Sequence, residues 1–157
     1  MPLFAPITRI LLLIVPLAAG CSVAPPRIAE TPTGRPEVTI AEVEIEAVNN
    51  ELINRMQNDQ WLLEEQSANM LLFSKEITGG DAGWARLITG GSSPVGEVRY
   101  TLTETQVGVR VVAALYISAQ LSNGADKRDD MNGNNNFWNG AQGILQATKA
   151  HFEIASN

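Results

Sequence analysis

Two neighbouring stretches in the second half of the chain alternate apolar and polar residues. Every second residue from Val107 to Ile117 is apolar, and the stretch before it places Val98, Tyr100 and Leu102 between polar residues. Because successive side chains of a β-strand point to opposite faces of a sheet, this pattern predicts an antiparallel pair of strands with one buried face. Their connection lacks strong turn-forming residues, so the register between them stays open.

A different spacing predicts two helices. Apolar residues recur three and four positions apart over residues 41–59 and again over residues 137–155, which places them on one stripe of each helix. The stripes are Ala41, Ile45, Val48, Leu52 and Met56 in the first helix, and Phe137, Ala141, Leu145, Thr148 and Phe152 in the second. Glutamates crowd the first turns of the first helix, where the helix dipole favours them. We expect a solvated face there rather than a metal or catalytic pair.

The chain between these helices also holds a predicted hairpin. Residues 61–66 and 69–77 are rich in strand-forming residues and are separated by a short polar connection. The side chains that face the core stay open between two sets of alternating residues. These sets are Met70 with Leu72 and Leu71 with Phe73.

The remaining segments define the fold class. Residues 37–40 are expected to form a short strand, whereas residues 78–94 and 122–136 are expected to be loops, the first with one helical turn near residues 82–88. The sequence therefore predicts one α+β domain over residues 37–157, a two-layer structure with a mainly antiparallel sheet of about four to five strands and two helices on one face. The other face carries Arg99, Thr101, Thr103 and Arg110 and is expected to be wet or to dock a partner.

The first 20 residues have the pattern of a secretory signal peptide. Arg9 precedes an apolar run of 11 residues, 10–20, which is too short to cross a bilayer but is typical of a signal sequence. The run ends at small residues and at Cys21, the one cysteine of the chain. The pattern from Leu17 to Cys21 resembles the lipobox of bacterial lipoproteins. An ordinary cleaved signal, or an uncleaved anchor with an incidental cysteine, is the alternative.

The lipobox resemblance implies a cellular location and a lipid modification. It implies cleavage between Gly20 and Cys21, a diacylglyceryl group on the Cys21 thiol, and an acyl chain on the new amino terminus. Two or three chains anchor a protein stably, whereas one binds only marginally. Ser22 is similar to the residue found there in lipoproteins sorted to the outer membrane, so we expect the domain on the periplasmic face of that membrane. No further cofactor is expected.

The lipidated cysteine and the proline-rich segment that follows it make up residues 21–36. The segment holds Pro25, Pro26, Pro32 and Pro36, which exclude a helix and favour an extended tether. At about 3.1 Å per residue such a tether could hold the domain up to about 45 Å from the bilayer. A segment packed against the domain is the alternative.

Charge and cysteine content narrow the classes of partner. The 137 residues after residue 20 carry ten basic and 17 acidic side chains, a net charge of −7. This acidity argues against nucleic acid as a partner. With Cys21 acylated the mature chain has no thiol left for a disulfide, so apolar burial and hydrogen bonds must hold the fold.

Candidate catalytic and metal-binding residues are few. His151 is the one histidine, and the sequence contains no metal-binding, nucleophile-elbow or phosphate-loop motif. The acidic and amide side chains of the 122–136 loop offer oxygens of the kind that calcium prefers, but the glycine and glutamate of a calcium-binding loop are missing. These side chains are Asp126, Asp129, Asp130, Asn132 and Asn134. An ordinary surface loop is the favoured interpretation, and calcium stays open.

Three tryptophans are notable, and two of them are candidate contact residues. Trp84 and Trp138 could anchor a partner protein or an envelope polymer, although core packing is the simpler interpretation. Three stretches, 49–76, 96–115 and 135–150, resemble a type of small proteobacterial lipoprotein that includes accessory subunits of envelope assembly or secretion complexes. The resemblance implies a non-enzymatic scaffold or accessory subunit with a protein partner in the envelope. A small-ligand or lipid-binding module is the alternative, and an enzyme is less favoured.

Overall fold

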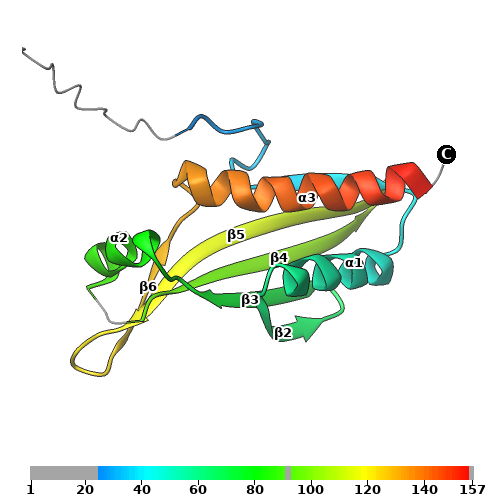
Figure 1. Cartoon of the computed structure of the whole chain (residues 1–157). Helices are drawn as coiled ribbons and strands as arrows, with labels where there is room; N and C mark the ends of the chain where they lie inside the picture. The colour runs from blue at the N-terminus through cyan, green and yellow to red at the C-terminus, as the bar shows by residue number, and fades with distance from the viewer. Residues whose placement is uncertain (1–24, 91–92, 156–157) are drawn as a thin grey trace, which may run out of the picture.

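The computed structural model describes residues 25–90 and 93–155, which form an α+β domain (Figure 1). In chain order the elements are β1 Glu37–Ala41, α1 Ile45–Asn58, β2 Leu62–Ser67, β3 Met70–Glu76, α2 Gly80–Thr89, β4 Val95–Thr105, β5 Gly108–Gln120, β6 Asp126–Asp130 and α3 Asn135–Ala155. The predicted class, with a mainly antiparallel sheet, is confirmed. Within the described residues the sheet has six strands, where four to five were predicted. The same residues form three helices, where two were predicted.

The two additional elements lie where loops were predicted. α2 occupies most of the glycine-rich segment, and its glycines mark its ends, because Gly79 and Gly90 both have positive φ (70° and 68°) and flank the helix. β6 lies in the polar 122–136 segment and pairs with the second half of β5. Its sequence lacks apolar alternation, so the free edge of β5, rather than intrinsic propensity, fixes it as a strand.

The sheet is organised around β5. One edge of β5 pairs along its length with β4, which is followed outward by β3 and β2, and every pairing is antiparallel. The other edge pairs with β1 over residues 108–112 and with β6 over residues 116–120. Between these strands Ala113 N–H donates to the Pro36 carbonyl at 2.8 Å, and Leu115 N–H donates to Asn132 Oδ1 at 3.2 Å. The backbone of β5 is therefore bonded on both sides.

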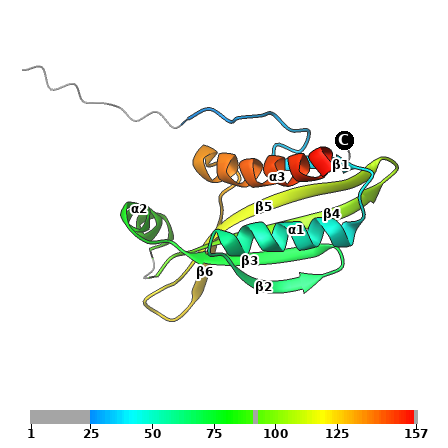
Figure 2. The ribbon, with the colours of Figure 1, turned by 45° about the vertical axis from the view of Figure 1, so that its right-hand side comes forward.

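All three helices cover the same face of the sheet. The alternating apolar residues of β4 and β5 are buried there as predicted, except that Val107 precedes β5 and is exposed. β3 contributes Leu71 and Phe73 rather than Met70 and Leu72. α1 and α3 run side by side over this face, and α2 lies at one end of the sheet (Figures 1 and 2). On the opposite face, Thr101 and Thr103 are exposed.

The turn between β4 and β5 requires glycine at its end. Gly108 has a φ of 141°, and a Cβ atom built there would lie 2.0 Å from the Ile40 carbonyl oxygen and 2.8 Å from the Ala41 Cα. The close approach lets Glu42 N–H donate to the Val107 carbonyl at 3.1 Å, which joins the end of β1 to the turn. No other residue type fits between the two backbones.

Gly108→Ala is therefore expected to lower the free energy of unfolding by more than about 3 kcal/mol, because both the dihedral angle and the backbone contact forbid the added methyl group. Gly124→Ala is the matched control, since Gly124 also has positive φ (80°) but has nothing within 4 Å of an added Cβ. It should cost about 1 kcal/mol. Urea unfolding of the two variants measures the difference, and equal losses would contradict the steric argument.

Candidate functional site

Residues 26–36, named the strap here, lie against the first turns of α3. Arg27 donates through Nη2 to the Asn132 carbonyl at 2.9 Å and through Nε to Asn135 Oδ1 at 3.3 Å. Asn139 donates to the Pro26 carbonyl and accepts from Ile28 N–H, both at 2.9 Å. These residues were predicted to be part of an extended tether, with a segment packed against the domain as the alternative, and the structure shows the packed segment. Prolines exclude a helix, but an extended segment that contains them can still bind the domain through its backbone carbonyls.

Trp138 holds the strap from beneath. Its side chain is fully buried, and its Nε1 donates to the Gly34 carbonyl at 3.0 Å. The Arg27 guanidinium lies 5.2 Å from the centre of the indole ring, within cation–π range. In this structure the indole is a core residue that binds the chain's own segment, and a contact between Trp138 and a partner stays a prediction.

The structure describes the other predicted site residues only in part. Trp84 belongs to α2, and its side chain lies outside the described part of the chain. Gly20 and Cys21 precede the described residues. His151 lies on the exposed side of α3, with Nδ1 3.8 Å from Glu51 Oε1. In the described residues no helix has the length and apolar character needed to cross a membrane.

The candidate calcium ligands have local partners. Asn132 Oδ1 accepts from Leu115 N–H at 3.2 Å, and Asn134 Oδ1 accepts from the backbone N–H of Asn136 at 3.0 Å, which caps the start of α3. Asp129 forms an ion pair with Lys127 at 3.1 Å. Among the described residues no three acidic, histidine or cysteine side chains form a group that could hold a metal ion. The loop oxygens thus serve the fold.

A groove between α1 and α3 is a surface depression that the sequence did not single out. It consists of two adjoining cavities of about 390 Å³ each, which share Asp59, Gly140 and Ile144. The apolar part lies over the sheet and is lined by Trp61, Val98, Leu115, Phe137 and Ala141. Two glycines, Gly140 and Gly143, open the α3 side, because neither has a heavy atom within 4 Å of where a Cβ would be.

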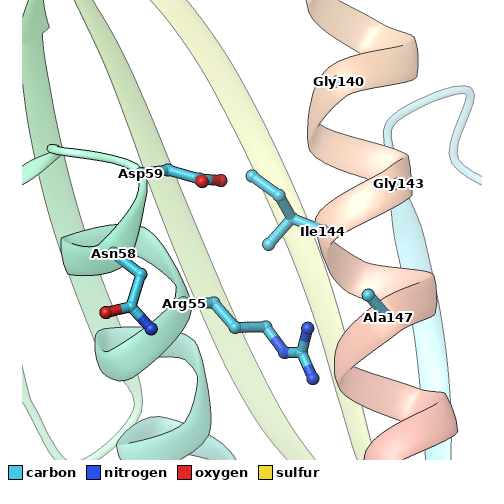
Figure 3. A pocket seen from close by; sticks show the side chains of 7 residues that line it. All are labelled: Arg55, Asn58, Asp59, Gly140, Gly143, Ile144 and Ala147. Atoms are coloured by element: carbon cyan, nitrogen blue, oxygen red, sulfur yellow. The ribbon is translucent and has the colours of Figure 1, made fainter.

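Charged side chains line the polar part of the groove. Figure 3 shows Arg55 and Asp59 directed from the end of α1 toward α3. Arg55 Nε lies 2.6 Å from Glu51 Oε1, one turn earlier, so its charge is balanced. The Asp59 carboxylate makes no hydrogen bond or ion pair with any residue that the structure describes, whereas its backbone carbonyl accepts from Lys75 Nζ at 2.7 Å. The groove is therefore amphiphilic, with an apolar floor and ionic rim.

The core beneath the groove is closed. Tyr100 is fully buried and its hydroxyl donates to Met56 Sδ at 3.4 Å. Burial, and secondarily the negative charge of Asp59, raise the pKa of this hydroxyl above its usual range. The phenol therefore stays neutral at physiological pH and fills the interior.

The groove could have been suspected from one sequence signal. Gly140 and Gly143 interrupt an otherwise regular helical stripe, and each glycine costs about 1 kcal/mol relative to alanine in a helix interior. The α1 side, Arg55 and Asp59, carries no comparable signal, since charged residues on an exposed helix end are ordinary. The tertiary packing of α1 beside α3 brings the two sides of the groove together.

Comparisons with known proteins give no relative from which a function could be carried over. A scan of protein-family models finds no match to this chain, and a search of curated proteins finds none either.

The strap predicts a local effect of one amide side chain. Asn139→Ala removes both hydrogen bonds to Pro26 and Ile28. It is expected to speed hydrogen exchange of the Ile28 amide about tenfold, the factor that corresponds to one net hydrogen bond.

Gln146→Ala is the control for this measurement, because Gln146 is an exposed amide residue of the same helix. Its exchange profile over residues 26–36 should match the unsubstituted protein. Unchanged protection of Ile28 in Asn139→Ala would show that the strap is held by other contacts.

Proposed function

We propose that this protein is a lipid-anchored, non-enzymatic lipoprotein whose domain serves as a scaffold or accessory subunit of an envelope complex on the periplasmic face of the outer membrane. The sequence from Leu17 to Cys21 supports the anchor, and Ser22 supports outer-membrane sorting. The observation that carries the proposal is the strap. It binds Pro26 to α3 five residues after Cys21, so a lipid on Cys21 would hold the domain near the membrane.

The groove between α1 and α3 is the proposed contact surface for the protein partner. Its apolar floor suits an inserted apolar side chain, and its rim of Arg55 and Asp59 suits polar groups around that side chain. Contact sites of this kind combine a buried apolar anchor with a polar rim. This surface replaces Trp138, whose side chain is buried.

A small-ligand or lipid-binding module is the second candidate. The observation that favours it is the place of the apolar cavity, between α3 and the β5 residue Leu115. The side chains of Trp61 and Phe137 form two of its walls and could hold an acyl chain or an aromatic ring. The two candidates predict different occupants for one groove.

The anchor is tested at Cys21. Cys21→Ala should abolish metabolic labelling with palmitate and release the protein from membrane fractions, because the Cys21 thiol carries the proposed lipid. Ser22→Ala is the control, since it leaves the thiol in place. A Cys21→Ala protein that still labels or still sediments with membranes would contradict the anchor.

The groove is tested by filling it. Gly140→Leu places a side chain in both cavities, and it should also stabilise α3 by about 0.8 kcal/mol, so any loss of binding is not a loss of folding. Gln146→Leu, an exposed position on the same helix, is the matched control. The two measurements are binding of the neutral apolar fluorophore N-phenyl-1-naphthylamine and crosslinking to envelope proteins in intact cells.

The outcomes separate the candidates. Loss of one crosslinked protein band in Gly140→Leu alone, without saturable fluorophore binding to the unsubstituted protein, supports the scaffold. Saturable fluorophore binding that weakens about tenfold or more in Gly140→Leu supports the ligand module. Identical behaviour of Gly140→Leu, Gln146→Leu and the unsubstituted protein in both assays would exclude the groove from either role.

A further inference from the structure

The strap shortens the chain between the lipid and the domain. Pro26 and Ile28 are hydrogen-bonded to Asn139 on α3, so only residues 21–25 separate the start of the lipidated chain from its first fixed point. A fully extended chain covers about 3.5 Å per residue, so this point lies within about 18 Å of the membrane surface. The predicted tether of residues 21–36 would have allowed about 45 Å.

α2 lies at the same end of the domain as this fixed point. Lys127 Nζ, on β6, donates to the Ile88 carbonyl at the end of α2 at 2.9 Å, and β6 pairs with the last residues of β5. The chain runs from β6 directly into the start of α3, which carries the strap. Figures 1 and 2 both show α2 beside the end of the sheet over which α3 begins.

α2 exposes apolar side chains on the side away from the sheet. Ala85 is fully buried against the sheet, whereas Leu87 is 86% exposed and Ile88 is 37% exposed. An exposed leucine and isoleucine next to each other on a short docked helix are costly in water. A lipid surface within reach of the same end of the domain would cover them.

The opposite end of the domain is acidic. Four glutamates, Glu42, Glu44, Glu46 and Glu104, are exposed around the β4–β5 turn and the start of α1. β5 runs the length of the sheet between the two ends, and 13 residues of strand span about 40 Å. Anionic head groups repel this end and favour an orientation in which it points away from the bilayer.

We infer that the domain is oriented, with the end formed by α2 and the start of α3 facing the bilayer, and that Leu87 and Ile88 of α2 contact the lipid surface. This inference rests on the anchor at Cys21 proposed above. It names a membrane-contact surface that is separate from the groove between α1 and α3.

The experiment uses the full lipidated protein in vesicles of phosphatidylcholine with a minority of phosphatidylglycerol. Because the natural cysteine is acylated, one added cysteine takes an environment-sensitive fluorophore alone. The two sites are Leu87→Cys on α2 and, as the matched control, Val107→Cys, which is 63% exposed at the acidic end. Quenching by brominated lipids is measured after vesicle flotation.

The label at residue 87 is expected to be quenched at least about twofold more than the label at residue 107, since contact quenching requires the label to reach the lipid. Adding Asn139→Ala should bring the two values closer, because the freed strap lengthens the tether. Equal quenching at both sites, or none at residue 87 in protein that floats with the vesicles, would overturn the orientation. Protein that does not float refutes the anchor, and with it this inference.

Discussion

Every part of the structure depends on the need to pair both edges of β5. The strand is 13 residues long and its inner face is buried, so unpaired backbone groups along it would each cost about 1–3 kcal/mol. β4 pairs with one edge along its length, but the other edge is bonded by two separate segments of chain: Pro36 with β1, and β6 with Asn132. The piece before β1 and the piece after β6 therefore meet at the middle of the strand. This meeting point is where the strap lies against the start of α3.

Part of the fold was predictable because its signals are local. The period of two in β4 and β5 and the stripes of α1 and α3 set the class, since each records which face of an element is buried. β6 was missed because its sequence, DKRDD, is polar and becomes a strand only through the free edge of β5. α2 was missed because its flanking glycines suggest a loop, although here they end a helix. The two errors share a cause, which is that tertiary contacts override weak local propensity.

The candidate site was less predictable than the fold. One of the two aromatic side chains chosen from the sequence, Trp138, proved to be buried, since burial depends on what packs over it, and Gly34 of the strap is 104 residues earlier in the chain. The groove forms between the end of α1 and the glycines of α3, and no local pattern connects them. Its shape also bears on its use. Ligand sites commonly enclose most of a bound molecule, whereas a depression open along one side can cover only part of it. An inserted side chain from a protein partner fits that geometry better than a free small molecule.

The strap connects the proposed lipid anchor at Cys21 to the proposed scaffold role through effective concentration. For a flexible tether, the concentration of the domain near a membrane partner falls roughly as the −3/2 power of tether length. Reducing the free chain from 16 residues to five raises that concentration by about sixfold, before any effect of orientation is included. A short tether also limits rotation, so a groove on the helical face of the domain is presented over a restricted range of heights and angles. In the proposed function, the bonds that hold the strap thus act on partner binding at a distance from the groove. They do so without touching the partner, because they shorten the flexible tether and so keep the domain from moving away from the membrane.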